Sequence, residues 1–567
     1  MESAVPACRR LQDQAWCAGV TLVDLFALPS KLLKRVQRRF LRVRENSAIT
    51  RKAAQIATGI PQVEHKAPVI FFRASTGTTD FSLNSGFHIL ASWALRLQKV
   101  PVIHFACHSG MSHCVMGTSR VKPASPPPCR TCMAHSQALH TGADVHWFDY
   151  HRDQSLAGQL ANLSIPELLI YEHHHTAPNI PSPIPLGELV APGLRWILRR
   201  HNLFDDDGTR YLYREYILSA WSIAREFSRL LDQTHPQAVV VFNGQFYPEA
   251  TARWLARKRG IRSIAHEVGL LPFSAFFTEG DATAYPIDIP ADFELNDEQN
   301  ARLDVYLENR FQGKFSMAGI KFWPEMTGLD DMLIGKISRF KQIVPVFTNV
   351  VFDTSQPHAN TLFTDMFAWL DEILETTRKH QETLFIIRAH PDETRPGKES
   401  METVAGWVKA RSADSLPNII FIAPQEYLSS YELIQRSKFV MVYNSTIGLE
   451  AAIMGAPVLS GGRSRFTRYP IVFFPPDVET FRAQVEEFLA VDKVGFPPEF
   501  KRNARRFLYY QLFRTSLPFE RYLDTSYHPG FTHFKDFFPA DLLPENSPAM
   551  NAILEGIREG GDFMLKE

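Results

Sequence analysis

Apolar runs alternate with helical segments in two separate series along this chain, and this alternation most limits how the chain can fold. A first series of apolar runs, separated by helical segments, lies at 69–76, 100–110, 238–244 and 261–267. A second series lies at 343–353, 383–391, 418–424, 438–445 and 456–462. This alternation is typical of parallel sheets joined by crossover helices. Because 567 residues exceed what one hydrophobic core usually serves, we predict an α/β protein with two doubly wound domains.

The same alternation of strands and helices predicts where the domains of the chain begin and end. We expect a basic amphipathic segment over 1–65 and a first α/β domain over 66–290, with a Cys-containing insertion at 107–135. A linker helix region over 291–340 precedes a second α/β domain over 341–500. A C-terminal helix and tail then occupy 501–567.

The charge balance and the hydropathy pattern exclude several classes of protein. The 61 Lys and Arg residues equal the 61 Asp and Glu residues, so any anion site is local and a nucleic-acid partner is not expected. No run of about 20 apolar residues is present, which argues against a membrane span. Arg9, Arg10 and Asp13 interrupt any signal-peptide core, so we expect a cytoplasmic protein.

The segment 28–45 has the pattern of a basic amphipathic helix. Five apolar residues recur at helical spacing, with Lys and Arg residues among them: Leu32, Leu33, Val36, Phe40 and Val43. One interpretation is a solvated helix that packs this apolar stripe on the main body. The other is a peripheral helix that lies on an anionic membrane surface.

The stretch "IIRAHPDE" at 386–393 ends an apolar strand on charged residues. Ligands of doubly wound sheets bind outside the carboxyl ends of the strands, so Arg388 and His390 are candidates for a ligand-facing crevice. An imidazole there can hydrogen-bond a phosphate, and the alternative is a histidine satisfied by neighbouring backbone. For Asp392 and Glu393 we expect solvated loop positions.

The stretch "VYNSTIGLEAAIMGAPVLSGG" at 442–462 has the pattern of a phosphate seat. A strand ends at Asn444, and Ser445 or Thr446 can cap a helix that begins near Ile447. Free backbone N–H groups and hydroxyls then lie at the positive end of the helix, and Gly448 permits a close approach. The alternative is an ordinary strand, cap and helix without a ligand. For Arg463, Arg465 and Arg468 of "GGRSRFTRYP" at 461–470, a solvated surface is the default expectation, and the alternative is that one of them contacts an acceptor or a diphosphate.

Four cysteines form the second chemical signal. Cys107, Cys114, Cys129 and Cys132 lie in the insertion and include one C-x-x-C pair. They could hold a structural Zn²⁺ in tetrahedral thiolate coordination. Free buried thiols and a disulfide remain alternatives, the disulfide disfavoured by a reducing cytosol.

The pairing of His390-Pro391 with the "NST" turn and "GLEAAIMGAPV" some 55 residues later resembles bacterial capsule polysaccharide biosynthesis glycosyltransferases. These are GT-B enzymes, similar in motif logic to polysialyltransferases and Kdo transferases. The resemblance implies two Rossmann-like domains that face a cleft, with the donor in the second domain and the acceptor in the first.

The resemblance also implies roles for individual residues. His390 and Ser445 would hold the donor phosphate, less surely with Thr446, and Glu450 would lie against the ribose or sugar. Glu267 of "HEVG" is the nearest match to the acceptor base, while the alternative is an ion pair with Arg253 or Arg257. No metal is implied for catalysis.

The function expected is transfer of a sugar from a CMP-, UDP- or GDP-linked donor to a surface polysaccharide or glycolipid acceptor. Two alternatives share the fold, a nucleotide-sugar 2-epimerase and a CDP-polyol phosphotransferase. A third alternative is a non-catalytic binding or scaffold protein.

Overall fold

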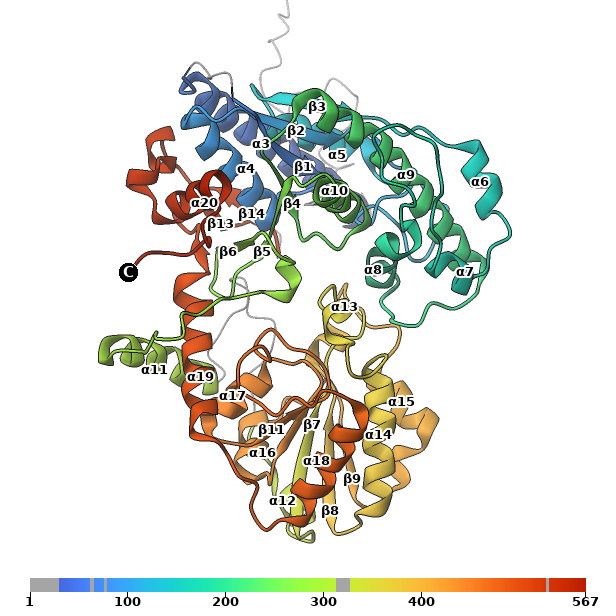
Figure 1. Cartoon of the computed structure of the whole chain (residues 1–567), viewed down its shortest axis with the longest axis vertical. Helices are drawn as coiled ribbons and strands as arrows, with labels where there is room; N and C mark the ends of the chain where they lie inside the picture. The colour runs from blue at the N-terminus through green and yellow to red at the C-terminus, as the bar shows by residue number, and fades with distance from the viewer. Residues whose placement is uncertain (1–29, 62–65, 76–78, 313–326, 527–529) are drawn as a thin grey trace, which may run out of the picture.

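The chain folds around two parallel β-sheets, one in each of two domains (Figure 1). The computed structural model describes residues 30–61, 66–75, 79–312, 327–526 and 530–567, with the side chains of 30–35 left out. The predicted segment before residue 30 therefore lies outside the described residues.

The first sheet has seven strands in the order β12-β6-β5-β4-β1-β2-β3. These are β1 (Val69–Arg73), β2 (Val102–Cys107), β3 (Asp144–Phe148), β4 (Ala238–Phe242), β5 (Arg262–Val268), β6 (Ser274–Thr278) and β12 (Leu517–Pro518). The five strands from β5 to β3 are parallel, whereas β6 and β12 run antiparallel to their neighbours. The chain reverses its direction of growth between β1 and β4, which makes that pair a topological switch point.

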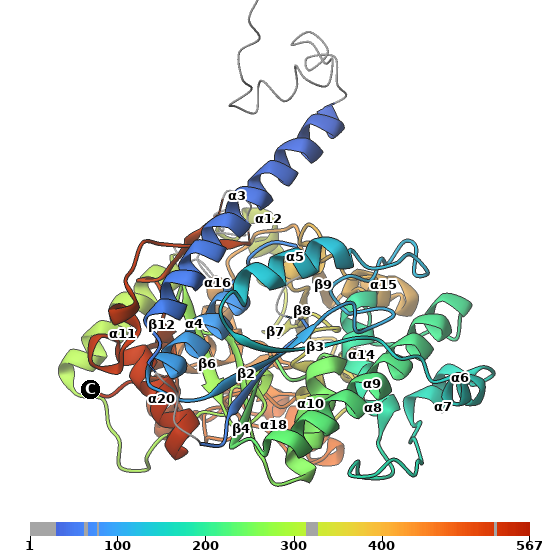
Figure 2. The same cartoon turned by 90° about the horizontal axis from the view of Figure 1, so that it is seen from above.

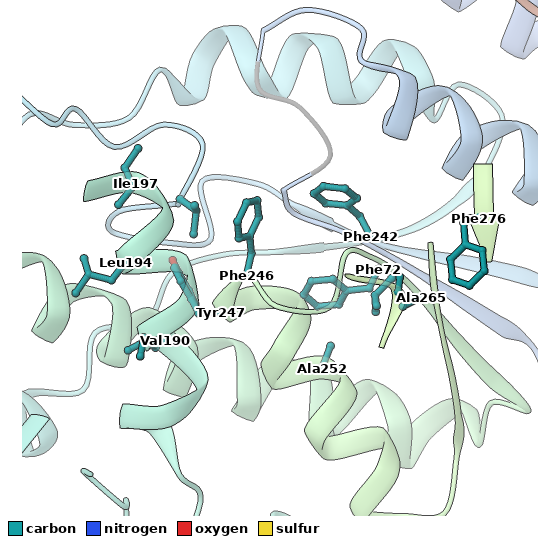
Figure 3. Close-up of a cluster of buried hydrophobic side chains, with 14 of the residues drawn as sticks. Phe72, Val190, Leu194, Ile197, Phe242, Phe246, Tyr247, Ala252, Ala265 and Phe276 are labelled. Carbon is teal, nitrogen blue, oxygen red and sulfur yellow. The ribbon is translucent and has the colours of Figure 1, made fainter. Parts of the chain in front are cut away.

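Helices cover both faces of this sheet because its strands are apolar on both sides. Phe71 and Val240 face a core that includes α4 (Leu83–Leu97) and α20 (Pro548–Glu559). Phe72 and Val241 face the opposite core, formed with α8 (Leu186–Leu198), α9 (Asp207–Thr234) and α10 (Tyr247–Lys258). Figure 3 shows part of this second core, where Leu194 of α8 and Tyr247 of α10 belong to the same hydrophobic core as Phe72 of the sheet.

Further helices lie in the first domain and in the region that joins the two domains. They are α5 (Cys129–Leu139), α6 (Gln154–Leu160), α7 (Ile165–Leu169), α11 (Asp297–Phe311) and α12 (Asp331–Ile337). The linker helix α11 begins with a capping box, in which Asn296 accepts from the Gln299 N–H and Gln299 accepts from the Asn296 N–H.

The second sheet has five strands, all parallel, in the order β11-β10-β7-β8-β9. Its strands are β7 (Gln342–Phe347), β8 (Thr383–Arg388), β9 (Ile419–Ile422), β10 (Val440–Val442) and β11 (Val458–Ser460). Its helices are α13 (Gln356–Ala359), α14 (Met366–Lys379), α15 (Val404–Arg411), α16 (Ser430–Arg436), α17 (Ile447–Met454) and α18 (Val478–Ala490). The switch point of this sheet lies between β7 and β10.

After the second sheet, the chain crosses back to the first domain. Helix α19 (Pro498–Tyr509) continues as a π-helix over Tyr510–Arg514 and runs between the domains in Figure 1. The strand β12 that follows pairs with β6, and a small hairpin of β13 (Leu523–Thr525) and β14 (Thr532–Phe534) leads toward α20. The residues after 500 thus complete the first domain as well as forming the expected helix. Two Rossmann-like domains that face each other in this way form a GT-B fold.

Hydrogen bonds join the two domains at more than one place. Asn243 donates to the hydroxyl of Thr354 at 3.2 Å, and the His358 ring lies 2.9 Å from the hydroxyl of Thr283. At another point the carboxylate of Glu402 accepts from the backbone N–H of His201 at 2.9 Å. The structure therefore shows the domains in mutual contact.

The N-terminal helix α3 (Ser30–Thr58) is attached to the first domain by its C-terminal half, where Ile49, Ala53 and Ile56 are buried. Its other half extends away from the body in Figure 2. Val36, Phe40 and Val43 are 55%, 44% and 60% exposed, so the interpretation that this apolar stripe packs on the main body is wrong for these three residues. Within the described residues, no helix combines the length and the apolarity needed to cross a membrane.

Helix α20 should stabilise the first domain although it lies at the far end of the sequence. Ile553 is fully buried in the core that α20 shares with α4, so we expect Ile553→Ala to lower the free energy of unfolding by about 2 to 5 kcal/mol. Equilibrium unfolding in urea measures this change. The control is Val305→Ala on α11, where a side chain that is 62% exposed should leave stability within about 0.5 kcal/mol of the original. Equal effects of both substitutions would contradict the packing described here.

Candidate active site

A cavity of about 920 Å³ lies between the two domains. The first domain contributes Trp196, Arg199 and Asp281 to its wall, and the second domain contributes the loops that follow β7, β8 and β10. Pockets that bind small molecules and cofactors have volumes of roughly 300 to 1,000 Å³, so this cavity is large enough for a nucleotide sugar.

The switch point of the second sheet opens directly into the cavity. Asn349 follows β7, Asn444 follows β10, and the Asn349 amide donates to the Asn444 side-chain oxygen at 2.7 Å. Carboxyl ends of parallel strands at a switch point form the usual ligand crevice of doubly wound sheets. The cavity therefore lies where this fold normally binds its ligands.

His390 follows β8 and lines the cavity, as Asp392 does. Its Nδ1 accepts a hydrogen bond from the Asp392 backbone N–H at 3.1 Å, so the neutral ring carries its proton on Nε2. Burial lowers the pKa of His390 and outweighs the opposing effect of the Asp392 carboxylate. At neutral pH this histidine is therefore a neutral hydrogen-bond donor through Nε2–H rather than a cation.

Ser445 and Thr446 lie at the N-terminus of α17, which begins at Ile447. Both residues line the cavity, and Thr446 at the cap position makes no side-chain capping bond to the helix. The first N–H groups of a helix have no partner within the helix and carry its positive partial charge. The structure thus brings Asn444, Ser445, Thr446 and His390 together around one cavity.

Positive side chains dominate the rest of the cavity wall. They are Arg199, Arg395, Lys398, Arg463, Arg465 and Arg468, and they outnumber the lining carboxylates of Asp281, Asp353 and Asp392. Arg465 stacks on the Tyr285 ring, and Arg199 stacks on Trp196 with 4.1 Å between the guanidinium carbon and the ring centre. Arg465 is therefore not simply solvated as expected, whereas Arg463 and Arg468 are exposed where they line the cavity. The excess of cations suits an anionic ligand.

Sequence reasoning missed Arg199 and Lys398 because each is distant along the chain from the recognised motifs. Arg199 ends α8 in the left-handed conformation with φ of 60°, and its guanidinium also lies over the ring of Phe352 from the second domain. Lys398 follows the 3₁₀ turn after His390. For Arg199, the signal that the sequence offered was the run of basic residues at the end of α8.

The comparisons with known proteins bear on the second domain. Residues 325–469 match the family model of capsule polysaccharide biosynthesis proteins. This match confirms, for that segment, the family that the sequence motifs resemble, and the segment contains His390, Asn444, Ser445 and Thr446. Among curated protein sequences, none matches this chain.

Solved structures similar to this chain include a β-Kdo 2,4 transferase, KpsC of Thermosulfurimonas dismutans. It is 12% identical with a TM-score of 0.34, over 50% of this chain and 80% of that chain. Another is UDP-GlcNAc 2-epimerase from Neisseria meningitidis, 14% identical with a TM-score of 0.22, over 78% of this chain and 98% of that chain. Because both TM-scores are low, the fold assignment rests on the two sheets described above.

Two residues of the capsule-family segment that were predicted to bind the donor lie away from the cavity wall. The Glu450 carboxylate is buried against Arg310 at 2.8 Å and accepts from the Tyr431 hydroxyl at 2.8 Å. Gly448 packs against the strand, since an added Cβ would lie 3.0 Å from a methyl group of Val442. These contacts fix α17 to its neighbours.

Arg388 also lies outside the cavity wall. Its guanidinium is buried and donates to the Leu428 carbonyl, and burial lowers the pKa of Arg388 to about 10. Strand β8 ends at Arg388, whereas His390 caps the 3₁₀ turn that follows and lines the cavity. The two candidates of this strand end therefore lie in different surroundings.

Glu267 lies in the first domain and is held by two amides. Asn243 donates to its carboxylate at 2.7 Å and Asn84 at 3.3 Å. Burial raises the pKa of Glu267, and the Asp353 carboxylate of the cavity wall raises it further. The alternative of an ion pair with Arg253 is wrong, because Arg253 pairs with Asp281 at 2.6 Å. Arg257 also lies near Asp281, at 3.6 Å.

The four cysteines of the insertion are all free and partly buried, so the disulfide alternative is not present. In the described part of the chain, no group of three or more His, Cys, Asp or Glu side chains is arranged to hold a metal ion. Bound zinc at Cys107, Cys114, Cys129 and Cys132 thus stays a prediction.

Glu393 was expected in a solvated loop, and this is wrong. Its side chain is 1% exposed, and its carboxyl group accepts from the Val404 N–H at 3.1 Å. Burial raises the pKa of Glu393 to about 8, so the folded protein keeps this carboxyl protonated at neutral pH. In the unfolded chain the group ionises near pH 4.3, a typical value for Glu.

We therefore expect Glu393→Gln to stabilise the protein increasingly as the pH rises. In the original protein, the stabilisation that the protonated Glu393 carboxyl provides is complete below the pKa of Glu393 in the unfolded chain. This stabilisation is lost as the pH rises through 8, whereas the Gln side chain stays neutral at every pH. The stability difference between variant and original should grow by about 1 kcal/mol per pH unit between pH 5 and pH 8. Urea unfolding at several pH values measures it. The exposed Glu487→Gln is the control, and a difference for Glu393→Gln that does not change with pH would contradict the assignment.

Proposed function

We propose that this protein is a glycosyltransferase that moves a sugar from a nucleotide donor to a surface polysaccharide or glycolipid acceptor. The observation that supports it best is the cavity itself, in which the capsule-family segment presents His390 and the N-terminus of α17 to a positively charged space. The donor binds against the second domain, and the acceptor enters from the first.

The lining residues suit the chemistry of a departing nucleotide. When the bond between the sugar and the phosphate breaks, negative charge develops on the phosphate oxygens. Nε2–H of His390 and the hydroxyls of Ser445 and Thr446, which lie at the positive end of α17, can donate hydrogen bonds to those oxygens. Arg463 and Arg465 supply positive charge at the same wall, a task that a divalent metal performs in other enzymes. The mechanism we propose therefore has no metal step.

The acceptor hydroxyl must lose a proton, and two carboxylates are candidates for its base. Glu267 is the residue that the family resemblance implies, and its raised pKa suits a proton acceptor. Asp353 lines the cavity directly and accepts from the Ser355 hydroxyl at 2.7 Å. We assign the role to Glu267. A smaller loss of turnover in Glu267→Gln than in Asp353→Asn would transfer the role to Asp353.

His390→Ala should lower kcat/KM for sugar transfer by about 100- to 1,000-fold, because removal of one donor to a developing negative charge costs that much. The assay incubates the purified protein with CMP-, UDP- and GDP-linked sugars and an acceptor extract, and records the released nucleotide and the labelled product. Ser445→Ala should show a loss of the same kind. The matched control is His380→Ala. His380 lies just before β8, at the amino end of that strand and away from His390, and it pairs with Glu486.

Several outcomes of this assay would oppose transfer. Interconversion of the donor sugar without an acceptor would favour a 2-epimerase, and release of CMP with a polyol phosphate on the acceptor would favour a phosphotransferase. Polysaccharide synthesis that persists in cells with a folded His390→Ala, Ser445→Ala double variant would favour a non-catalytic scaffold.

We also propose that α3 places the protein at the inner face of a membrane. Val36, Phe40 and Val43 are exposed on a helix that also carries Arg38 and Arg39, which suits a surface with anionic head groups. A cytoplasmic protein held at the membrane in this way would meet lipid-linked acceptors.

Flotation with liposomes tests the membrane proposal. The protein should float with vesicles that contain phosphatidylglycerol and should float less with vesicles of phosphatidylcholine alone. The double variant Phe40→Asp, Val43→Asp should lose most of this binding, while Val305→Asp on exposed α11 should keep it. Equal flotation of the two variants would contradict the proposal.

A further inference from the structure

A second cavity of about 640 Å³ adjoins the cavity between the domains. Asp281 and Pro357 line both cavities, so the two spaces meet at these residues. Helices α8 and α10 of the first domain form the main walls of the second cavity, which we call the α8–α10 groove. His390, Ser445 and Glu267 do not line this groove, so it has no part in the mechanism proposed above.

One face of α10 forms the first wall of the groove. Arg253 and Arg257 are four residues apart, as are Trp254 and Lys258, and residues at this spacing lie one above the other on a helix. Ala250 lines the groove one turn earlier. Between Ala250 and Lys258 the helix rises by roughly 12 Å, at 1.5 Å per residue. The groove is therefore long enough for a short oligosaccharide.

One face of α8 forms the opposite wall. Glu188, Ala191 and Arg195 line the groove at intervals of three and four residues. Another face of the same helix packs in the core through Leu194, which Figure 3 shows. The wall is thus held by a helix whose position the core fixes, and the groove does not depend on a loop.

Positive side chains outnumber carboxylates in the groove. The cations are Arg195, Arg253, Arg257 and Lys258, and the carboxylates are Glu188 and Asp281. Asp281 already pairs with the buried Arg253 at 2.6 Å, whereas Arg257 and Lys258 are exposed. In the part of the chain that the structure describes, no carboxylate forms an ion pair with Arg195 or Lys258. The groove therefore attracts an anionic ligand.

Trp254 adds an aromatic surface among these cations. Its ring is partly exposed, and Lys258 Nζ lies 5.7 Å from the ring centre. A pyranose ring has a face of C–H groups that packs on an aromatic ring, and carboxylate or phosphate substituents on the sugar bind Arg and Lys. A small inorganic anion would not use the ring, and a neutral ligand would not use the cations. An anionic saccharide uses both.

We propose that the α8–α10 groove binds the acceptor as an anionic saccharide, with a sugar ring on Trp254 and acidic groups beside Arg195, Arg257 and Lys258. This inference rests on the proposed glycosyltransferase function and specifies the chemistry of the acceptor. The end of the saccharide enters the cavity between the domains past Asp281 and Pro357, where the groove and the cavity meet. The donor lies against the second domain on the other side of that cavity.

Calorimetric titration of the full-length protein tests the groove without any need for turnover. Hexagalacturonate, a carboxylated oligosaccharide, should bind, and its affinity should fall as the salt concentration rises. Maltohexaose, which has no carboxylates, should bind about tenfold more weakly or not at all. Equal affinities for the two sugars would overturn the proposal. Tighter binding of a hexaglutamate peptide would also overturn it and would favour an acidic protein segment as the occupant.

Substitutions in the groove locate the binding of hexagalacturonate. Arg257→Ala and Trp254→Ala should each raise its Kd about tenfold. Arg502→Ala is the matched control for Arg257, because its side chain is 58% exposed compared with 50% and likewise lies 3.6 Å from a carboxylate. Phe204→Ala is the control for Trp254, since that ring is 58% exposed outside the groove. Equal affinities of Arg257→Ala and Arg502→Ala would overturn the proposal, and both variants test it even if Trp254→Ala fails to fold.

Steady-state kinetics separates the groove from the proposed function. Trp254→Ala should raise the acceptor concentration that gives half-maximal rate and should leave the KM for the donor unchanged. An unchanged acceptor requirement in a variant that still transfers sugar would overturn the groove and leave the proposed function intact. Binding of hexagalacturonate that depends on Arg257, in a protein that transfers no sugar, would overturn the proposed function and support the groove as a saccharide site.

Discussion

The return of the chain from the second domain to the first is the constraint on which the site depends. Helix α19 packs on α17 of the second domain, and the strand that follows it joins the edge of the first sheet. Arg506 of α19 donates to the Pro290 carbonyl at 2.8 Å, and Arg505 pairs with Asp304 of the linker helix at 2.7 Å. These contacts hold the first domain against the loops that follow β7, β8 and β10, and residues of both domains line the cavity between them.

The balance of charge differs between the contacts that hold α17 in place and the cavity wall. Away from the cavity wall, Arg310 pairs with the buried Glu450. In the cavity wall, basic side chains exceed carboxylates, and His390 stays neutral with its donor N–H available on Nε2. An anion in the cavity would offset this excess of basic side chains. This contrast separates Glu450, which forms that ion pair, from Ser445, which lies five residues earlier and lines the cavity.

The local pattern of the sequence was enough to find the residues that directly follow strands. His390, Asn444 and Ser445 come together because every parallel strand delivers the residue after its carboxyl end to the same edge of the sheet. The same reasoning fails one residue inside a strand end, since Arg388 is still within β8 and its side chain is buried beside Leu428. It also fails for Arg199, which reaches the cavity only because α8 of the first domain ends opposite Phe352.

The sequence by itself determined the two α/β domains, the strand ends that carry polar residues and the helix that begins at Ile447, because apolar periodicity and capping are local properties. Only the tertiary structure decided that Glu450 is satisfied by Arg310, that Glu393 is buried and protonated, and that residues after 500 complete the first sheet. Only it placed the basic residues of three distant segments around one cavity. Contacts between residues far apart in the chain depend on how the domains pack, and no local pattern records them.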